Sequence, residues 1–355
     1  MDLNGIIKEV VEKQASDVFI VAGRPLSYKV NNSLYDYTDK KLSADDTREL
    51  ITQIYALANG RDMSYFIAHG DDDFSFSLRG VARFRANIYK QRNSYAAVIR
   101  VVAFVLPDPK ALSIPENVLM QVDDMKGLVL VTGASGCGKS TTLACMIDRI
   151  NKSKQVHIVT LEDPIEYLHS HNMSIISQRE ISLDTDTYIT ALRAVVRQSP
   201  DVILIGELRD DETTQIAMTA SETGHLVLST LHTLGAANTI DRIIDMFPAD
   251  KEQQVRLQLS MVLQAVITQQ LVMTKDGKLK PVFEIMICNS AIRNLIREAK
   301  THQIDSVIQS SAAQGMITMD TALMNLYKGG EIDEETLISH SYNPEAVAKR
   351  IAANQ

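Results

Sequence analysis

Apolar and polar residues follow two different periods in the N-terminal part of the chain. Apolar residues recur at helical spacing from Leu3 to Lys13, which predicts a helix. A period of two predicts a strand from Asp17 to Val21. The same period predicts a hairpin from Leu26 to Tyr37, with its turn at Asn31-Asn32 because asparagine tolerates positive φ.

A second helix and further strands complete this region. Ser43 and Asp46 have the spacing of a capping box and predict a helix that runs through Ala58. Alternating stretches predict strands at Phe74 to Leu78, Arg83 to Tyr89 and Ala96 to Val105, with Arg79-Gly80 joining the first two. Residues 1–105 are therefore predicted to form an α+β domain.

The pattern changes after this domain. Pro107, Pro109 and Pro115 disfavour both helix and central strand, so residues 106–126 are predicted to be a linker. From Gly127 onward strands and helices alternate, which is typical of a parallel sheet with crossover connections. The predicted strands are Leu128 to Thr132, Val156 to Leu161, Val202 to Ile205 and Leu226 to Thr230, and the helices between them are Thr141 to Ile150, Thr187 to Arg197 and Asp211 to Glu222. This order predicts an α/β fold with a RecA-like P-loop NTPase core over residues 127–290.

The last part of the core reads as a helix followed by a hairpin. Asp250 to Ile267 has apolar residues at helical spacing and is predicted to be an amphipathic helix. Val272 to Ile287 is predicted to be a hairpin around Lys275-Asp276-Gly277. Short helical patterns follow Asn289, so residues 291–355 are predicted to be a C-terminal helical region.

The stretch Leu128 to Met146 carries a nucleotide-binding motif in the context that it requires. Gly133 to Ser140 fits G-x-x-x-x-G-K-[ST] between an apolar strand and an amphipathic helix. Glycine lets several backbone N–H groups converge on phosphate oxygens at a helix N-terminus. A structural glycine-rich turn is the alternative, which the flanking strand and helix disfavour.

This P-loop predicts ATP and Mg²⁺ as ligands. Lys139 is expected to reach the β and γ phosphates, and Ser140 to bind Mg²⁺. The predicted nucleotide-binding residues are Gly133, Ala134, Ser135, Gly136, Cys137, Gly138, Lys139, Ser140 and Thr141.

Acidic residues follow two of the predicted strands. The segment TLEDPIE places Glu162, Asp163 and Glu166 together, which near a triphosphate requires a metal, a water or cationic partners. In a P-loop site one of them is suited to activate the attacking water, whereas a solvated acidic turn is the alternative. The segment DVILIGELR has the Walker B pattern with Gly206 in place of the usual Asp, so Glu207 is predicted to contact Mg²⁺ through water.

Two histidines bracket the last core strand in GHLVLSTLH. A single histidine is more often structural than functional, and His225 and His232 each have that alternative. Because the pair flanks a strand beside the P-loop, we expect the two residues to sense the γ-phosphate or to couple it to shape. Zinc is not predicted, since no cysteine or third histidine lies at ligand spacing.

Composition narrows the class of NTPase. The 355 residues suggest two domains, and 45% hydrophobic with 23% charged residues is ordinary for a soluble globular protein. The formal net charge of -8 provides no overall basic field that would attract nucleic acid or anionic lipid. The sequence shows neither a membrane-spanning apolar run nor a leader, and its three cysteines form no CxxC pair. These features predict a cytosolic protein in a reducing compartment.

With these segments in place, the chain resembles the secretion ATPase superfamily, and more closely the type IV pilus retraction ATPase (PilT) family. The resemblance covers essentially the whole length. It rests on the Walker A motif GASGCGKS, the Asp box TLEDPIE, the Walker B segment LIGELRD and the His box TGHLVLSTLH.

The octet AIRNLIRE is the most specific part of this resemblance. It matches a motif associated with retraction rather than assembly ATPases, and from its residues alone it is an amphipathic helix with Ile292, Leu295 and Ile296 inward. The residues of this retraction motif are Ala291, Ile292, Arg293, Asn294, Leu295, Ile296, Arg297 and Glu298.

The resemblance also assigns roles within the core. It implies that Glu166, the last residue of the Asp box, is the general base and that Glu207 helps to hold Mg²⁺. It implies that His225 and His232 couple the state of the phosphates to the shape of the protein.

For the first domain the resemblance implies a PAS-like fold whose arginines contact the nucleotide when the domains close. Arg85 and Arg100 are the matching positions. Surface residues on a strand face are the alternative for both. The interval from Pro107 through Lys126 contains no arginine, so no further arginine contact is expected from the linker.

The loop departs from the family pattern at two places. Ala134-Ser135 and Cys137 stand where family members commonly have Pro-Thr and Ser. A backbone cradle tolerates these changes, because it uses N–H groups. At a helix N-terminus we expect the pKa of the Cys137 thiol to be lowered, which would make it oxidisable beside the phosphates.

The function implied by the resemblance is that of a homohexameric, Mg²⁺-dependent ATPase that drives type IV pilus retraction and twitching motility. It would dock at the cytoplasmic face of the inner or plasma membrane through a pilus platform protein, without a direct nucleic acid partner. The alternatives are a pilus-assembly or type II/IV secretion ATPase and, from a different class, a DNA translocase or a nucleotide-binding regulator. The assembly and type II relatives usually carry a further N-terminal domain and a four-cysteine zinc module, which this sequence does not show.

Overall fold

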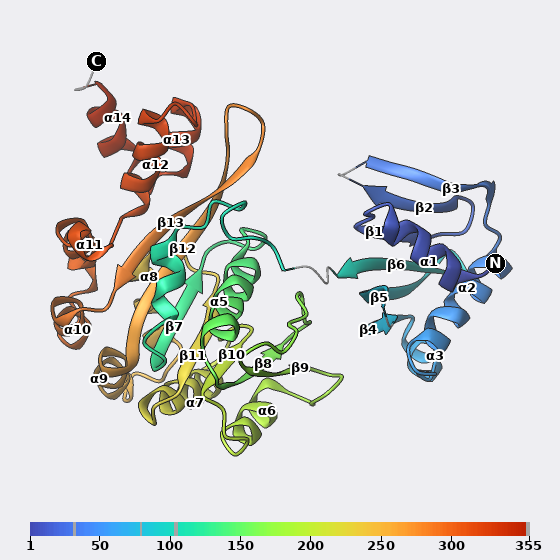
Figure 1. Cartoon of the computed structure of the whole chain (residues 1–355), viewed down its shortest axis with the longest axis horizontal. Coiled ribbons are helices and arrows are strands. Elements are labelled where there is room, and N and C mark those ends of the chain that lie inside the picture. Colours follow the sequence, from blue (N-terminus) through green and yellow to red (C-terminus); the bar gives the residue numbers. More distant parts are fainter. Residues whose placement is uncertain (31–32, 79, 103–105, 353–355) are drawn as a thin grey trace. The chain divides into compact units, whose positions relative to one another are not determined.

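The computed structural model describes residues 1–30, 33–78, 80–102 and 106–352. The chain divides into two compact units, residues 1–105 with 166–168 and residues 106–165 with 169–355 (Figure 1). Three sequence predictions, the Asn31-Asn32 turn, the Arg79 junction and the end of the strand predicted to reach Val105, lie outside the described residues.

The first unit is an antiparallel sheet with helices packed on it. The sheet has six strands in the order β3-β2-β1-β6-β5-β4. The elements are α1 (Leu3–Glu12), β1 (Asp17–Ile20), β2 (Pro25–Val30), β3 (Ser33–Lys41), α2 (Ala44–Leu57), α3 (Ser64–His69), β4 (Asp71–Leu78), β5 (Ala82–Gln91) and β6 (Ser94–Val102). The predicted capping box at the start of α2 is confirmed, because Ser43 and Asp46 bond each other's backbone N–H groups. Ile7 of α1, Ile51 of α2 and Phe84 of β5 share one buried core.

The second unit is built on a seven-stranded sheet in the order β13-β12-β7-β11-β10-β8-β9. All neighbours pair in parallel except the antiparallel β12 and β13. The strands are β7 (Gly127–Thr132), β8 (His157–Glu162), β9 (Ile175–Glu180), β10 (Val202–Ile205), β11 (Leu226–Leu231), β12 (Leu263–Met273) and β13 (Leu279–Ile287). This parallel α/β sheet is the RecA-like arrangement that the alternating pattern predicted.

Helices cover both faces of this sheet. They are α4 (Glu116–Leu119), α5 (Lys139–Ser153), α6 (Tyr188–Val195), α7 (Asp211–Glu222), α8 (Ala236–Asp245), α9 (Glu252–Val262), α10 (Ser290–Arg297), α11 (Ile304–Ser310), α12 (Met319–Lys328), α13 (Glu334–His340) and α14 (Pro344–Ala352), with short 3₁₀ turns at Met120–Val122, Thr301–Gln303 and Ala312–Gln314. The short helices at the C-terminal end confirm the prediction for the region after Asn289.

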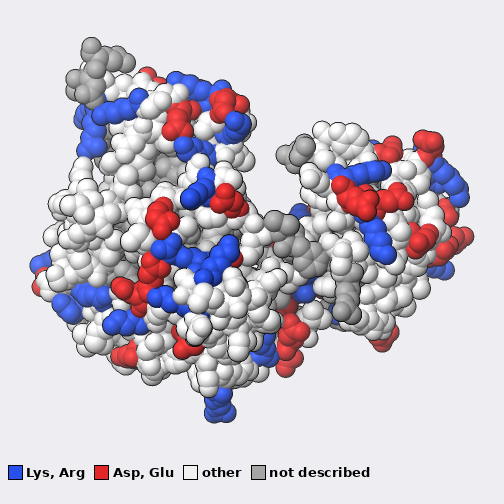
Figure 2. Space-filling model, viewed as in Figure 1, with Lys and Arg blue, Asp and Glu red and all other residues white. Residues whose placement is uncertain are grey.

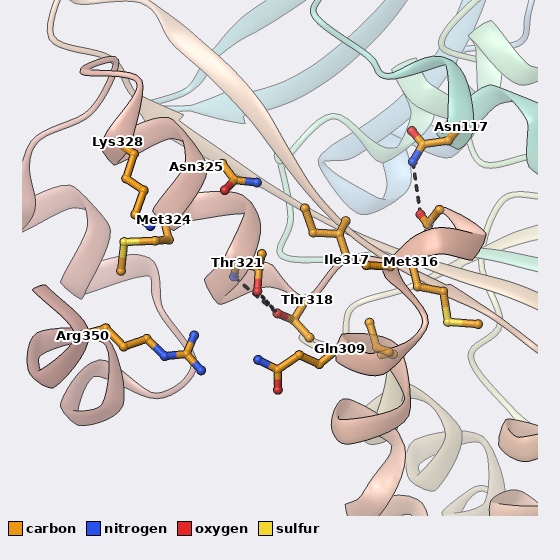
Figure 3. A pocket seen from close by; sticks show the side chains of 13 residues that line it. Asn117, Gln309, Met316, Ile317, Thr318, Thr321, Met324, Asn325, Lys328 and Arg350 are labelled. Carbon is orange, nitrogen blue, oxygen red and sulfur yellow. Dashed lines mark hydrogen bonds between the residues drawn. The ribbon is translucent and has the colours of Figure 1, made fainter. Parts of the chain in front are cut away.

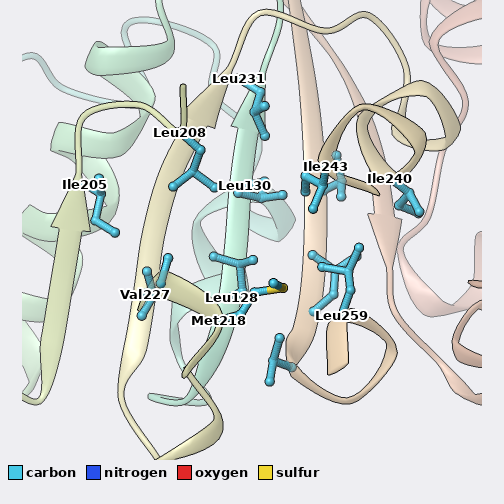
Figure 4. Packing of buried hydrophobic residues seen from close by; sticks show 14 of the residues in the cluster. Leu128, Leu130, Ile205, Leu208, Met218, Val227, Leu231, Ile240, Ile243 and Leu259 are labelled. Atoms are coloured by element: carbon cyan, nitrogen blue, oxygen red, sulfur yellow. The ribbon is translucent and has the colours of Figure 1, made fainter. Parts of the chain in front are cut away.

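Alternate residues of the central strands enter two different cores. Leu128 and Leu130 of β7 pack with helices that include α7, α8 and α9 (Figure 4). Val129 and Val131 pack on the opposite face with α4 and α5. Burying one such side chain contributes about 1.5–3 kcal/mol, so burial on both faces holds in place the strand from which the phosphate loop extends.

The segment predicted as a linker packs against the second unit. Residues 106–126 include α4, and Ile114, Val118 and Val122 are buried in the core that contains α5. This segment therefore forms part of the second unit.

The prediction of one long helix from Asp250 to Ile267 was wrong. Helix α9 ends at Val262, and β12 begins at Leu263. The apolar residues after Val262 fit both the helical period and the strand period. This segment forms a strand because it pairs in parallel with β7, which buries both of its faces. The predicted turn at Lys275-Asp276-Gly277 is confirmed between β12 and β13. Strand β9 was not predicted.

Charged residues of both signs are interspersed over the two units on the face shown in Figure 2. Among the described residues, no helix combines the length and apolar character needed to cross a membrane.

Candidate functional site

The phosphate loop connects β7 to α5 and wraps around the side chain of Lys139. Lys139 is only 8% exposed. Its Nζ donates hydrogen bonds to the carbonyl oxygens of Gly133 at 2.8 Å and Ala134 at 3.0 Å. Gly138 precedes the first helical residue and has φ +92°. The loop therefore holds a buried ammonium group at a helix N-terminus, which is the electrostatic environment that a phosphate requires.

Gln269 of β12 braces this loop from the adjacent strand, and sequence reasoning missed it. Its Nε2 donates to the carbonyl oxygen of Cys137 at 2.6 Å, and its Oε1 accepts from the Thr142 hydroxyl at 2.7 Å. A Cβ at Gly133 would lie 2.2 Å from the backbone oxygen of Gln269, and one at Gly138 would lie 2.9 Å from Nε2. The two glycines thus allow the loop to lie directly against Gln269.

His232 joins the phosphate loop to the acid that follows β10. Its Nδ1 lies 3.4 Å from Lys139 Nζ and 3.4 Å from Ser135 Oγ, and its Nε2 lies 3.3 Å from Glu207 Oε2. The Arg209 Nε donates to Glu207 Oε1 at 2.6 Å. The structure therefore brings the predicted residues Lys139, Glu207 and His232 into one polar chain.

Strand register explains why these residues converge. Thr132 of β7 pairs with Leu231 of β11, and Ser229 of β11 pairs with Ile205 of β10. The phosphate loop, His232 and Glu207 each follow one of these parallel strands, so they share the carboxyl edge of the sheet, where open parallel sheets bind ligands.

Two opposing effects act on the pKa of the Glu207 side chain. Burial by itself would raise the pKa of Glu207, but the Arg209 and His232 side chains bring that pKa below its ordinary value. Glu207 is therefore ionised at neutral pH and suited to a cationic ligand.

Gly206 stands at the usual Walker B acid position and lies close to Tyr188. A Cβ at this residue would lie 2.6 Å from the Tyr188 hydroxyl and 3.4 Å from the backbone oxygen of Leu161. Tyr188 of α6 fills the space that a carboxylate would need, which leaves Glu207 as the acid at this edge.

The Asp box begins at the end of β8. Glu162 accepts hydrogen bonds from the Thr160 hydroxyl at 2.6 Å and from Gln178 Nε2 at 3.2 Å. Asp163 and Glu166 are exposed. Glu166 belongs to residues 166–168, which group with the first compact unit, and its role as the base remains a prediction.

His225 is not close to His232, contrary to the expectation that both act beside the P-loop. Its backbone oxygen accepts from Gly127 N at the start of β7, and its Nδ1 lies 2.9 Å from the backbone oxygen of Ala220. The full length of β11, Leu226–Leu231, separates the two histidines, because each flanks a different end of the strand. His225 therefore lies at the end of β11 that is remote from the phosphate loop.

Arg85 and Arg100 are direct cross-strand neighbours in the first unit. Arg85 pairs with Arg100 between β5 and β6, and Asp17 pairs with Arg100 between β1 and β6. Arg85 Nη2 donates to Asp73 at 2.6 Å, and Arg100 Nε donates to Asp17 at 3.2 Å. Both guanidinium groups are thus paired with carboxylates, on one face of the sheet.

The retraction motif forms α10 with the orientation predicted from its pattern. Ile292 and Ile296 are buried, and Leu295 packs against the same core. Arg293 Nη1 donates to the carbonyl oxygens of Ser260 at 2.6 Å and Met261 at 2.8 Å, at the end of α9. The outward face of α10 carries the exposed residues Ala291, Asn294, Arg297 and Glu298.

The expectation that the pKa of the Cys137 thiol is lowered was wrong. Cys137 is buried, and this burial raises the pKa of its thiol above the ordinary value, with Lys139 opposing the change. The desolvation of the thiol outweighs the effect of the helix N-terminus.

A cavity of about 460 Å³ adjoins the first turn of α5. Its lining includes Gly138, Thr141 and Thr142 of the phosphate loop and helix, with Leu112 and Leu271 as apolar walls. Its position beside the loop and its size suit the nucleoside part of a bound nucleotide.

A second pocket of about 590 Å³ lies among the C-terminal helices (Figure 3). Lys328, Arg350, Thr318 and Thr321 line it, and Asn117 reaches it from α4. None of the residues that line it belongs to the phosphate loop.

Comparisons with known proteins show the family to which this chain is related. The family model described as Type II/IV secretion system protein matches residues 1–331. The Pseudomonas aeruginosa protein described as "Type IV pilus retractation ATPase PilT" is 42% identical over 346 residues, which cover 97% of this chain and 99% of that protein. A Neisseria gonorrhoeae "Twitching motility protein" is 44% identical over 309 residues, covering 87% and 82%. The crystal structure of the pilus retraction motor PilT with bound ADP superimposes with a TM-score of 0.90 at 43% identity, covering 98% of this chain and 99% of that one.

Proposed function

Because this chain belongs to the Type II/IV secretion system protein family and is a P-loop ATPase, we propose that it is the motor that drives type IV pilus retraction. The observation that carries the chemical part is the chain of contacts from Lys139 through His232 to Glu207. The similarity to retraction and twitching motility proteins over most of the sequence supports the biological part.

In the proposed reaction the phosphate loop binds the triphosphate of ATP through its backbone N–H groups. Lys139 exchanges its bonds to the carbonyl oxygens of Gly133 and Ala134 for bonds to the β and γ phosphates. His232 then reports on the γ-phosphate, because it already contacts Lys139 on one side and Glu207 on the other. After hydrolysis, ADP and phosphate replace ATP, so the charge next to Lys139 and His232 changes.

The residues present also fit Mg²⁺. The Ser140 hydroxyl and the ionised Glu207 carboxylate are oxygen donors, which this hard cation prefers. When bound, the ion would neutralise charge on the transferring phosphoryl group. Glu207 would hold it through water, while Ser140 would bind it directly.

The remaining catalytic roles follow the family pattern. Glu166 accepts a proton from the attacking water, and Arg85 and Arg100 supply positive charge to the transferring phosphoryl group. His225, which lies at the opposite end of β11 from His232, contributes through the position of that strand.

The working assembly that we propose is a homohexamer at the cytoplasmic face of the membrane. It acts on a platform protein of the pilus machinery, without a direct nucleic acid partner. The exposed face of α10, with Asn294 and Arg297, is available for contacts within this machinery.

Lys139→Ala tests the ATPase site. We expect the variant to lose ATP binding and turnover, because the buried ammonium would no longer offset the charge of the phosphates. Lys152→Ala is the matched control on the same helix, since the largely exposed Lys152 pairs with Asp148 at 2.6 Å. Phosphate release that is equally fast in Lys139→Ala and the parent protein would overturn the proposal.

Glu166→Gln tests the direction of the motor in cells. The gene is deleted and restored with Glu166→Gln, with the parent gene or with Glu335→Gln, which changes an exposed acid on α13. Pili that accumulate but do not shorten in Glu166→Gln cells support retraction. Cells without pili would indicate an assembly ATPase, and turnover stimulated by DNA would indicate a translocase.

A further inference from the structure

Glu284 of β13 holds the first residues of two different helices. Glu284 is only 1% exposed. Oε1 accepts a hydrogen bond from the N–H of Ala236, the first residue of α8, at 2.8 Å, and Oε2 accepts from the N–H of Met319, the first residue of α12, at 3.2 Å. Each oxygen of one buried carboxylate therefore satisfies a helix N-terminus.

Helix α8 continues the segment that carries His232. Only three residues separate His232 from Ala236, and this segment is ordered by its own hydrogen bonds. The Thr233 and Thr239 hydroxyl oxygens lie 2.7 Å apart, and Thr239 Oγ1 donates to the Gly235 carbonyl oxygen at 2.8 Å. One end of this segment thus contacts the phosphate loop through His232, and Glu284 holds the other end.

Helix α12 begins the group of helices that ends the chain. Asp320, the second residue of α12, accepts from the N–H groups of Tyr342 and Asn343 at 2.7 and 3.1 Å, which connects α12 to the segment before α14. The pocket of about 590 Å³ lies between residues of α11 and α12 (Figure 3), so the side of α12 toward α11 is incompletely packed. Helix α12 is held to the sheet by buried contacts of Met319 and Leu323 with Val272 and Val282, and by paired backbone hydrogen bonds between Ile317 and Ile285. The bond from Met319 N–H to Glu284 adds a buried polar contact at the first residue of this helix.

We propose that Glu284 is a positioning residue for ATP hydrolysis, which links the His232 segment to helices α12 to α14 and so transmits the state of the nucleotide to the C-terminal region. The inference rests on the role proposed for His232 in the ATPase site. Glu284 does not contact the phosphate loop, and it acts through the N–H of Ala236.

The charge of Glu284 can change near neutral pH. Burial raises the pKa of Glu284 to about 7, although the N–H groups of Ala236 and Met319 oppose this change. Asp305 of α11 and Asp320 of α12 raise it further, and the Tyr342 ring lies in the same environment. The ionised form accepts both hydrogen bonds most strongly, so the link weakens as the pH falls through about 7.

The test is the dependence of kcat and KM on pH for the full-length protein, measured between about pH 5.5 and 9. We expect the parent protein to lose kcat on the acid side with a midpoint near the pKa of Glu284. Glu284→Gln cannot ionise and offers only one acceptor oxygen, so its kcat should be about tenfold lower and its acid limb should be absent, with KM little changed. A purely structural role would lower the melting temperature without removing this limb.

Asp305→Asn is the companion variant, and it also covers the case in which Glu284→Gln does not fold. Removing a neighbouring negative charge lowers the pKa of Glu284, so the acid limb should move to lower pH. An acid limb that stays at the same pH in Asp305→Asn would overturn the inference.

His232→Ala separates the two proposals. If His232→Ala loses turnover while Glu284→Gln keeps the kcat and pH profile of the parent, the inference about Glu284 is wrong and the ATPase site stands. If His232→Ala retains full turnover, the role of His232 is wrong and the link through Glu284 is wrong with it.

Discussion

The side-chain amide of Gln269 donates a 2.6 Å hydrogen bond to the backbone oxygen of Cys137, inside the phosphate loop. The same amide accepts from Thr142 in the first turn of α5, so one side chain on β12 fixes both the loop and the helix that follows. Neither the loop nor α5 can shift relative to the sheet without breaking these buried bonds.

Gln269→Ala should therefore impair nucleotide binding as well as folding. It leaves the Cys137 carbonyl and the Thr142 hydroxyl without this partner, which costs about 1–3 kcal/mol. We expect a clear loss of stability and a KM for ATP raised about tenfold. Urea unfolding and steady-state kinetics measure both. Gln270→Ala is the control, because Gln270 instead donates to the His340 carbonyl oxygen at 3.2 Å, and it should leave KM unchanged.

Gly133→Ala and Gly136→Ala form a matched pair in the loop. Both glycines have positive φ, but an added Cβ meets the Gln269 backbone oxygen at 2.2 Å only at Gly133, and meets nothing within 4 Å at Gly136. Gly136→Ala should cost about 1–2 kcal/mol of backbone strain and weaken nucleotide binding less than Gly133→Ala does. Gly133→Ala should lose binding of a fluorescent ATP analogue. Equal affinities in the two variants would show that the contact with Gln269 is unimportant.

The ion pairs of Arg149 predict a pH-dependent contribution to stability. Arg149 donates to both carboxylate oxygens of Asp123 at 2.8 Å and to Glu116 at 2.7 Å, which ties α5 to the segment before β7. The hydrogen bond from Arg149 holds the pKa of Asp123 below its ordinary value of 3.8, so the stabilisation is present above that value and is lost as the pH falls below it.

Arg149→Ala should therefore lower the free energy of unfolding by about 1 kcal/mol at pH 7, a value limited by the partial exposure of the pair. The difference from the parent protein should shrink in acid, as urea denaturation at a series of pH values would show. Lys152→Ala on the same helix should have little effect at any pH. A difference that grows on acidification would contradict this account.

Arg293 should support the fold of the retraction motif, whereas Arg297 should not. Arg293→Ala leaves the carbonyl oxygens of Ser260 and Met261 at the end of α9 without a charged donor, and should destabilise the protein by about 1–3 kcal/mol. Arg297 is exposed, so Arg297→Ala should change stability by less than about 0.5 kcal/mol. Thermal unfolding compares the two. If Arg297→Ala proves the more destabilising, the orientation of α10 is wrong.

Local chemistry explains which features the sequence could predict. The P-loop, the strand before it and the capping box at Ser43 are defined by residues close together in the chain, and the structure contains all three. Leu263 to Ile267 fits both periods, and only pairing with β7 makes it a strand.

Long-range contacts explain what the sequence could not predict. Gln269 lies 132 residues from Cys137 and Glu284 lies 48 residues from Ala236, so no local pattern marks either side chain. The separation of His225 from His232 likewise depends on both residues flanking one extended strand, where closeness in sequence does not bring side chains together.

The row of Asp17, Arg100 and Arg85 across the first sheet has a consequence for how an anion can recruit these arginines. Each guanidinium already has a carboxylate partner, so an incoming phosphate would compete with Asp17 or Asp73 for the positive charge. A weakly charged anion competes poorly in this exchange, whereas a dense cluster of negative charge competes well. On the role that we propose for Arg85 and Arg100, the two aspartates would therefore favour a triphosphate over a single phosphate at these arginines.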